Sequence, residues 1–241
     1  DHKLLGITAR GAWTSVERHF LERGIKVAND PITVLGVGDM AGDVFGNGML
    51  QSSALKLVGA FNHRHIFIDP DPNCASAFTE RQRLFALAGS AWSDYDPAVI
   101  SAGGGVFERS AKVILLSPEM QLMLDTSETS LAPDALIRLM LMMKVDLLFN
   151  GGIGTYVKSA DEANSDVGDK ANDALRVDGR DLRCKVLAEG GNLGITQLGR
   201  IEFALHGGAI NADFIDNSAG VDMSDHEVNL KIALGEGERQ S

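Results

Sequence analysis

The sequence predicts an α/β fold with one open, mostly parallel sheet and helices on both of its faces. Short apolar runs without polar alternation, typical of strands buried on both faces, alternate with segments of helical periodicity across most of the 241 residues. The 27 glycines fall mainly at the ends of these runs. A chain needs glycine where it must turn sharply or where a ligand must approach the backbone.

Composition sets limits on the kind of protein. A hydrophobic fraction of 44% is ample for a globular core, and 33 acidic against 22 basic residues give a net charge of −11. The acidic balance, without a basic cluster, argues against nucleic-acid or anionic-membrane partners. The longest apolar stretch, from Leu136, contains Arg138 and ends at Lys144, short of the roughly 20 residues that span a bilayer. Isolated cysteines at 74 and 184 favour free thiols and a cytoplasmic location.

Residues 31–69 predict a βαβ unit. Residues 31–38, PITVLGVG, are expected as a buried strand, residues 39–59 as a glycine turn and a helix, and residues 65–69, HIFID, as the second strand. The apolar positions that indicate the helix are Met49, Leu50, Ala54, Leu55 and Val58. The crossover between the two strands should be right-handed.

The later segments continue the alternation of helices and strands. Helices are expected over residues 75–92, from Ser117 and from Pro133, and a strand over residues 145–150. Next come an exposed helical excursion over 158–177, a hairpin-like reversal at 177–181, a strand ending at 189–192, a helix from 196, and a final strand and helix. The expected organisation is an N-terminal helix in residues 1–30, a nucleotide-binding domain over 31–232, and a tail over 233–241.

Gly36, Gly38 and Ala41 form a Gly-x-Gly-x-x-Ala motif between the first strand and its helix. In such a turn the first glycine permits the bend, the second admits a pyrophosphate, and the small third residue allows close packing of helix and strand. Asp39 and Met40 lie inside the turn and are therefore also candidate cofactor contacts. The motif predicts a Rossmann-like, doubly wound dinucleotide-binding fold.

Two further positions follow from that topology. Asp69, expected at the end of the second strand, would bind the adenine ribose hydroxyls and favour NAD over NADP, with Asp71 a poorer substitute. Asn150 and Gly151 end another strand, where a nicotinamide ribose would lie. The alternative is that the glycines only relieve packing, namely Gly36, Gly38, Gly42, Gly46 and Gly48.

The sequence offers no persuasive catalytic group. None of the six histidines has HExxH spacing, so a metal site is not expected. His226 stands in SDHE, but no serine lies in a G-x-S-x-G elbow, which argues against a triad. The lysines best suited to a buried catalytic role are at 112, 144 and 185, and nothing in the sequence around them indicates such a role.

Six segments, in order, resemble the glutamate dehydrogenases, and specifically the large NAD-dependent bacterial class. They are GVGDMAGDVFGNGML, FIDPDPN, SAGGGVFERSAK, LLFNGGIGTYVK, AEGGNLGITQLGRIE and INADFIDNSAGVDMSDHE, and the resemblance extends from Gly6 to Ile232. It implies an oxidoreductase that converts L-glutamate to 2-oxoglutarate and ammonia with hydride transfer to NAD. It also places the catalytic lysine and aspartate in a substrate domain before this region, so we expect this chain to bind NAD without turnover. We expect the parent protein to be a homo-oligomer.

The resemblance also assigns site residues. Thr8, in GITARG, resembles the threonine that meets the nicotinamide carboxamide, although Ala9 replaces the family's usual glycine. Asn192, in AEGGN, resembles an asparagine near the nicotinamide. Around the NSAGV segment, the positions similar to those that contact the glutamate substrate are Asn217, Val221 and Ser224.

Three alternatives stay open at this point. One is an S-adenosylmethionine-dependent methyltransferase, which usually carries an acid before its glycine loop, where this chain has Val34 and Leu35. Another is a non-enzymatic nucleotide-binding module. The third is a related dehydrogenase acting on leucine or phenylalanine, in which an apolar contact should replace Ser224.

Overall fold

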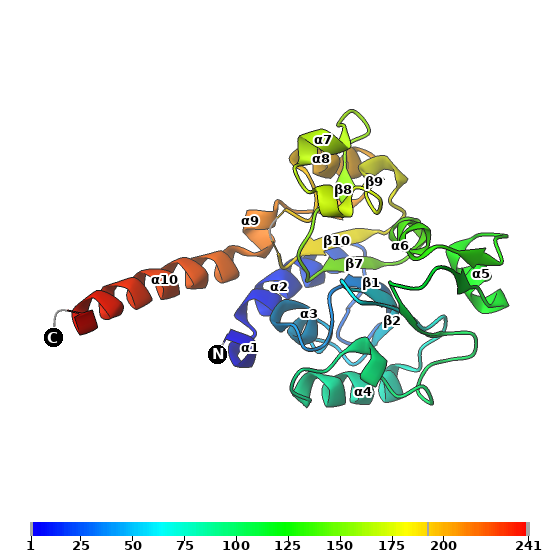
Figure 1. Ribbon diagram of the computed structural model, residues 1–241, viewed down its shortest axis with the longest axis horizontal. Coiled ribbons are helices and arrows are strands. Elements are labelled where there is room, and N and C mark those ends of the chain that lie inside the picture. Colours follow the sequence, from blue (N-terminus) through cyan, green and yellow to red (C-terminus); the bar gives the residue numbers. More distant parts are fainter. Residues whose placement is uncertain (1, 192, 240–241) are drawn as a thin grey trace.

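The computed structural model describes residues 2–191 and 193–239 (Figure 1). Its helices are α1 (His2–Leu5), α2 (Ile7–Leu21), α3 (Asp43–Gly48), α4 (Cys74–Ala86), α5 (Pro118–Leu124), α6 (Pro133–Met142), α7 (Asn164–Val167), α8 (Gln197–Leu205), α9 (Asp213–Asp216) and α10 (Ser218–Arg239), with 3-10 turns η1 (Trp92–Asp94), η2 (Lys170–Asn172) and η3 (Gly179–Asp181). Its strands are β1 (Ile32–Val37), β2 (Leu55–Phe61), β3 (His65–Ile68), β4 (Gly105–Glu108), β5 (Ile114–Leu115), β6 (Ser130–Leu131), β7 (Leu147–Asn150), β8 (Val157–Lys158), β9 (Val177–Asp178), β10 (Val186–Glu189) and β11 (Ala209–Ile210).

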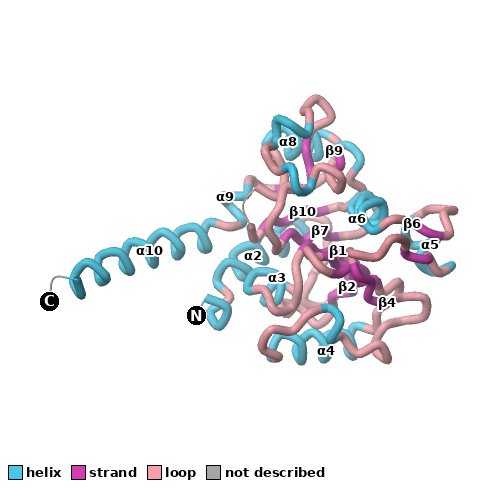
Figure 2. Tube along the Cα trace, viewed as in Figure 1, coloured by secondary structure: helices cyan, strands magenta, loops and turns pink. Residues whose placement is uncertain are grey.

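One seven-stranded sheet organises the structure, in the order β11-β10-β7-β1-β2-β3-β4 (Figure 2). The strands from β11 to β2 are parallel, and β3 and β4 are antiparallel to their neighbours. The chain leaves β1 for β2 on one side and later returns to β7 on the other. The strand order therefore reverses between β1 and β7, which is the switch point of a doubly wound sheet.

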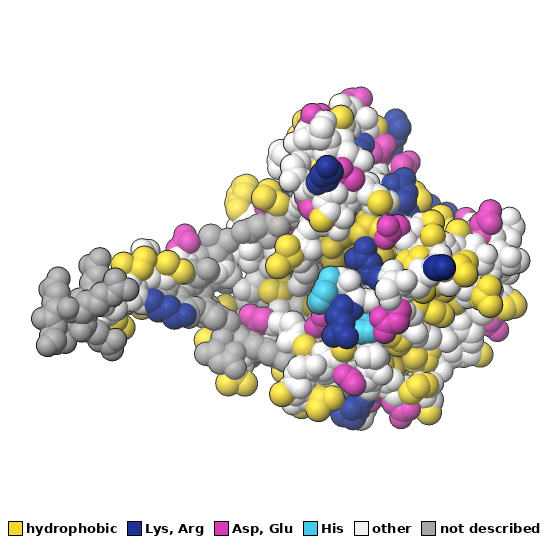
Figure 3. All heavy atoms as spheres, in the orientation of Figure 1, with side chains coloured by type: hydrophobic (Ala, Val, Ile, Leu, Met, Phe, Trp, Pro, Cys, Tyr) yellow, Lys and Arg dark blue, Asp and Glu magenta, His cyan; other side chains and the backbone are white. Residues whose placement is uncertain are grey.

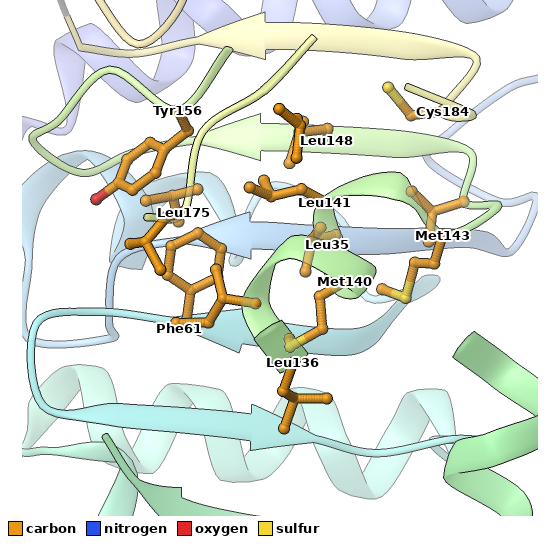
Figure 4. Packing of buried hydrophobic residues seen from close by; sticks show 14 of the residues in the cluster. Leu35, Phe61, Leu136, Met140, Leu141, Met143, Leu148, Tyr156, Leu175 and Cys184 are labelled. Carbon is orange, nitrogen blue, oxygen red and sulfur yellow. The ribbon is translucent and has the colours of Figure 1, made fainter. Parts of the chain in front are cut away.

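Helices cover both faces of this sheet, as the uninterrupted apolar strands predict. Leu35 of β1 packs into a core with Leu136 and Met140 of α6, as Figure 4 shows. Its neighbour Val34 points to the opposite face and packs into a second core with residues such as Phe20 of α2. Successive side chains of one strand thus enter two different cores. The predicted α/β fold, with a Rossmann-like doubly wound sheet, is confirmed.

The prediction of a helix from the apolar positions within residues 49–58 is wrong. Helix α3 ends at Gly48, and residues 55–61 form strand β2, which pairs with β1. Every residue of β2 except Lys56 is buried, because the strand lies inside the sheet, and a short apolar run of this kind fits either period. The βαβ unit therefore closes on β2, while β3 pairs antiparallel to β2 through Gly59 and Ile68.

Two other expectations are corrected. Strands β8 and β9 pair parallel, with Val157 opposite Val177, so the reversal at 177–181 is not a hairpin. The excursion over 158–177 contains only the single turn α7 and the 3-10 turn η2. The helix starts at Pro118 and Pro133 are confirmed, and Ser117 accepts a hydrogen bond from the Met120 amide as the predicted cap.

The two ends of the described chain are helical. Residues 1–30, expected to hold one helix, hold α1 and α2, which are separated at Gly6 in a left-handed conformation with φ of 58°. Helix α10 projects away from the sheet (Figure 1) and continues past Ile232, so the boundary expected there is not a structural break. Within the described residues, we find no helix with the length and apolarity that a membrane crossing requires.

Candidate dinucleotide-binding site

The carboxyl ends of β2, β1, β7 and β10 meet at one edge of the sheet. The Gly38 amide donates to the Phe61 carbonyl at 2.8 Å, the Gly151 amide to the Val37 carbonyl at 2.9 Å, and the Gly190 amide to the Asn150 carbonyl at 2.9 Å. Each of three adjacent strands at the switch point is therefore followed directly by a glycine. In open α/β sheets, ligands bind in the crevice at this place.

The glycines at the end of β1 and in the turn that follows it let α3 lie directly on the sheet. A Cβ on Gly36 would come within 2.2 Å of the Phe45 ring, and one on Gly38 would lie 2.7 Å from the Phe45 Cβ. Gly38 also has a φ of 133°, which side chains rarely adopt. The packing alternative thus accounts for Gly36, which is buried. It also accounts for Gly46 and Gly48, whose added Cβ atoms would each meet another atom at 2.6 Å.

Residues 38–42, which we name the β1 turn, are closed by the side chain of Asp39. Its Oδ1 accepts hydrogen bonds from the amides of Ala41 at 3.1 Å and Gly42 at 3.0 Å. The Trp92 indole supports the turn from below by donating to the Gly38 carbonyl at 3.0 Å. Gly38, Asp39 and Ala41 remain half-buried and accessible. Met40 is 2% exposed within the core, so only its backbone can reach a ligand at this turn.

Asp69 does not lie at this edge, contrary to the position expected for it. It follows the antiparallel strand β3, and its amide bonds to the carbonyl of Val58, in the middle of β2. Its carboxylate is fully buried and accepts hydrogen bonds from the Ser101 amide and hydroxyl. Burial raises the pKa of this carboxyl group. Asp71 is also displaced, because it pairs with Lys56 near the amino end of β2.

Asn150 lies at the switch point but faces inward. It is 4% exposed, and its Oδ1 accepts from the Gly152 amide at 3.4 Å. Its amide nitrogen lies 1.7 Å from where a Cβ of Gly194 would stand, so the two residues are closely packed. Asn150 therefore shapes the loops, while the half-buried Gly151 leaves backbone accessible at the surface.

The loop after β10 is held by a buried ion pair that the sequence reasoning missed. We name residues 190, 191, 193 and 194 the β10 loop; Asn192, the predicted nicotinamide contact, lies outside the described residues. Glu189 is fully buried, accepts from the Gly194 amide at 2.7 Å and pairs with Arg200 of α8. Burial raises the pKa of Glu189, against the opposing effect of Arg200. The one sequence signal was an acid that ends an apolar strand.

Thr8 and Asn217 come together although 209 positions separate them in sequence. Each is 7% exposed, and a Cβ on Gly220 would lie 2.4 Å from the Thr8 hydroxyl and 2.4 Å from the Asn217 amide oxygen. They adjoin the carboxyl end of β10, because Asp216, which precedes Asn217, accepts a hydrogen bond from the amide of Glu189, the last residue of β10, at 3.2 Å. Val221 and Ser224 follow on the backbone of α10, but their side chains lie outside the described part of the chain.

Glycine lets two loops of this edge come close together. The loops after β7 and β10 approach so closely that a Cβ on Gly191 would stand 3.2 Å from the Gly152 carbonyl. Side chains there would fill the space above the backbone, and glycine leaves it open. Over the described residues, no group of three His, Cys, Asp or Glu side chains could hold a metal ion.

Comparison with known proteins agrees with this geometry. Residues 1–241 match the family of the bacterial NAD-glutamate dehydrogenase catalytic domain. The chain is 66% identical over 236 residues to the NAD-specific glutamate dehydrogenase of Pseudomonas aeruginosa, and 56% identical over 240 residues to that of Mycobacterium tuberculosis. These matches cover 98% and 97% of this chain but only 15% of each relative, so the chain spans a small part of their length.

A solved structure shares the fold at low sequence identity. The glutamate dehydrogenase of Plasmodium falciparum superposes with a TM-score of 0.56 and 14% identity, covering 95% of this chain and 39% of that one. At that identity the likeness concerns the fold alone. The family match and the two bacterial relatives, in contrast, extend over almost the whole sequence. The chain therefore belongs to the bacterial NAD-glutamate dehydrogenase catalytic-domain family.

Proposed function

We propose that this chain is the coenzyme-binding part of a glutamate dehydrogenase. In this proposal, the longer parent protein oxidises L-glutamate to 2-oxoglutarate and ammonia, with hydride transfer to NAD. The observation that carries it is the row of glycine turns after β1, β7 and β10 at the switch point. Membership of the family supports NAD as the dinucleotide and glutamate as the substrate.

The β1 turn would hold the pyrophosphate. Gly38 and Ala41 present accessible backbone there, next to the half-buried side chain of Asp39. Gly36 and Met40 would act indirectly, by letting α3 pack on the sheet and by anchoring the turn in the core. The turn therefore offers backbone surface rather than a cationic pocket to the phosphates.

The other half of the edge would receive the nicotinamide. Gly151 and the β10 loop, with Asn192, are proposed to border its ribose and ring, and Thr8 to meet its carboxamide. The closeness of Thr8 and Asn217 supports a shared boundary between coenzyme and substrate. Beyond that boundary, Val221 and Ser224 are proposed, with Asn217, to contact glutamate.

Turnover is proposed to need the rest of the parent protein. The family resemblance implies that the catalytic lysine and aspartate lie in a separate substrate domain, and such a pair would supply the acid–base chemistry of the reaction. When bound, NAD supplies the hydride acceptor. This chain would orient it and exclude water. We also propose that the parent is a homo-oligomer, which light scattering on that protein would test.

Calorimetric titration of the chain with NAD tests the proposal. We expect NAD to bind, and Ala41→Glu to weaken binding by about tenfold or more, because it places a negative charge beside the pyrophosphate. Ala75→Glu, in the exposed first turn of α4, is the matched control and should leave binding unchanged. Binding of S-adenosylmethionine but not NAD would overturn the proposal. Robust glutamate-dependent NADH formation by the chain alone would overturn the proposal that turnover needs the rest of the parent protein.

A further inference from the structure

The carboxyl end of β2 lacks the acid that usually selects NAD. In dinucleotide-binding folds, an Asp or Glu at this strand end binds the adenine ribose hydroxyls, and an arginine nearby accommodates a 2′-phosphate. Here residues 61–64, all within the described chain, are Phe, Asn, His and Arg. Arg109 reaches the same place, with its Nη1 donating to the Asn62 carbonyl at 3.2 Å. In Figure 3, His and Lys or Arg side chains gather near the middle of the viewed face.

An acid nevertheless reaches this strand end from the β1 turn. The Oδ2 of Asp39 accepts a hydrogen bond from the Asn62 side-chain amide at 2.8 Å. The Asn62 Oδ1 in turn accepts from the amides of Arg64 and His65, both at 2.8 Å. Asn62 thus connects the loop between β2 and β3 to the β1 turn, and it fixes the direction of the Asp39 carboxylate.

We propose that Asp39, positioned by Asn62, is the residue that reads the adenine ribose and excludes a 2′-phosphate. This inference rests on the proposed function. The Asp39 carboxylate is half-buried and receives three hydrogen bonds, from Ala41, Gly42 and Asn62, which leaves acceptor capacity for a ribose hydroxyl.

The electrostatic balance of the strand end gives Asp39 this role. Arg109, which also pairs with Asp134 at 3.3 Å, and the exposed Arg64 would, without Asp39, favour a 2′-phosphate at this strand end. Asp39 supplies the opposing negative charge on the β1 side of the same strand end. A phosphate dianion bound beside that carboxylate would be repelled, whereas a neutral ribose hydroxyl would donate to it.

Binding of NAD and NADP to three variants tests the proposal by calorimetry. Asp39→Asn keeps an oxygen for the turn amides but removes the charge. We expect the ratio of the two dissociation constants, NADP over NAD, to fall by at least about tenfold, mainly through tighter NADP binding. Asn62→Ala should lower the ratio less, because Asp39 keeps its charge but loses its direction. Asp71→Asn, which removes an exposed acid near the amino end of β2, is the matched control and should not change the ratio.

The outcomes separate this inference from the proposed function. If the unmodified chain binds NAD and the ratio is unchanged in both Asp39→Asn and Asn62→Ala, Asp39 is not the selecting residue and only this inference fails. If the unmodified chain binds neither dinucleotide, the proposed function fails and the inference fails with it. Circular dichroism of each variant checks folding. Should Asp39→Asn not fold, the ratio in Asn62→Ala decides alone.

Discussion

The β1 turn and the β10 loop both follow a parallel strand at the switch point, but different forces hold them. The β1 turn is closed by the accessible carboxylate of Asp39 and by close packing of Gly38 on Phe45. The β10 loop is anchored by the buried pair of Glu189 and Arg200. One half of the edge therefore depends on shape and backbone hydrogen bonds, and the other on a charge pair shielded from water.

This difference predicts where substitutions cost most. A buried charge that loses its partner keeps its full desolvation penalty, whereas a strained turn can relax partly. Substitutions that disturb the β10 loop should therefore cost the most folding stability. Substitutions in the β1 turn should instead change which dinucleotide the chain binds. The following three experiments test this contrast.

Arg200→Met should destabilise the folded chain most. The change removes the cation that faces the fully buried Glu189 carboxylate. The free energy of unfolding, measured by urea denaturation, should fall by about 3–5 kcal/mol. Arg18→Met is the control, because it breaks the exposed pair with Glu22 and should cost no more than about 0.5 kcal/mol. Equal losses in both variants would contradict the assigned importance of the buried pair.

Gly38→Ala should have the next largest effect. The new Cβ would lie 2.7 Å from the Phe45 Cβ, and the residue would keep a φ of 133°. We expect a loss of about 2–3 kcal/mol in the free energy of unfolding. Gly168→Ala isolates the backbone contribution, because Gly168 has a φ of 77° with nothing within 4 Å of the added atom. It should cost only about 1 kcal/mol. If the two variants lose the same stability, contact with Phe45 is not important.

The smallest effect is a dependence on pH. Burial raises the pKa of Glu189 in the folded state above its ordinary 4.5, so the folded chain holds this proton more tightly than the unfolded chain. The stabilisation from this group is present below pH 4.5 and is lost as the pH rises through the folded pKa. In urea denaturation from about pH 4 to 8, the free energy of unfolding of wild type should fall relative to that of Glu189→Gln as the pH rises.

Asp146 provides the control of opposite sign. Burial would raise its pKa, but hydrogen bonds from Lys185 and Thr33 outweigh burial and hold it below the ordinary 3.8. Its stabilisation is present above pH 3.8 and is lost as the pH falls through the folded pKa. This change lies at and below the ordinary pKa of 3.8, so the urea series for this variant runs from about pH 2 to 5. Over that range the free energy of unfolding of wild type should rise relative to that of Asp146→Asn as the pH rises. If the stability difference between wild type and variant changed in the same direction with pH for Glu189→Gln and Asp146→Asn, the assigned pKa shifts would be contradicted.

Much of the fold could be predicted from the apolar runs. Strands β1 and β7 are each indicated by a buried apolar run that ends in glycine, and β10 by the strand expected to end at 189–192. Strand β2 was not, because Leu55 and Val58 fit a helical spacing as well as a strand buried on both faces. That error moved the predicted ribose contact to Asp69, since it made β3 the second strand of the unit.

The site was only partly predictable, because its decisive contacts join distant positions. Asp39 meets Asn62 23 positions away, and Glu189 meets Arg200 11 positions away. No local pattern encodes either contact; each depends on which strands become neighbours. The glycines were predictable, because backbone freedom is a property of the residue itself. Their second purpose, close packing on Phe45, depends on the tertiary structure.

Titration of the chain with NAD in a calorimeter, with Ala41→Glu and Ala75→Glu measured beside it, decides whether this edge of the sheet binds the coenzyme. We expect one NAD site, weakened by about tenfold or more in Ala41→Glu and unchanged in Ala75→Glu. A folded chain that shows no heat of NAD binding would contradict it. So would equal binding by both variants, because the β1 turn would then not hold the coenzyme.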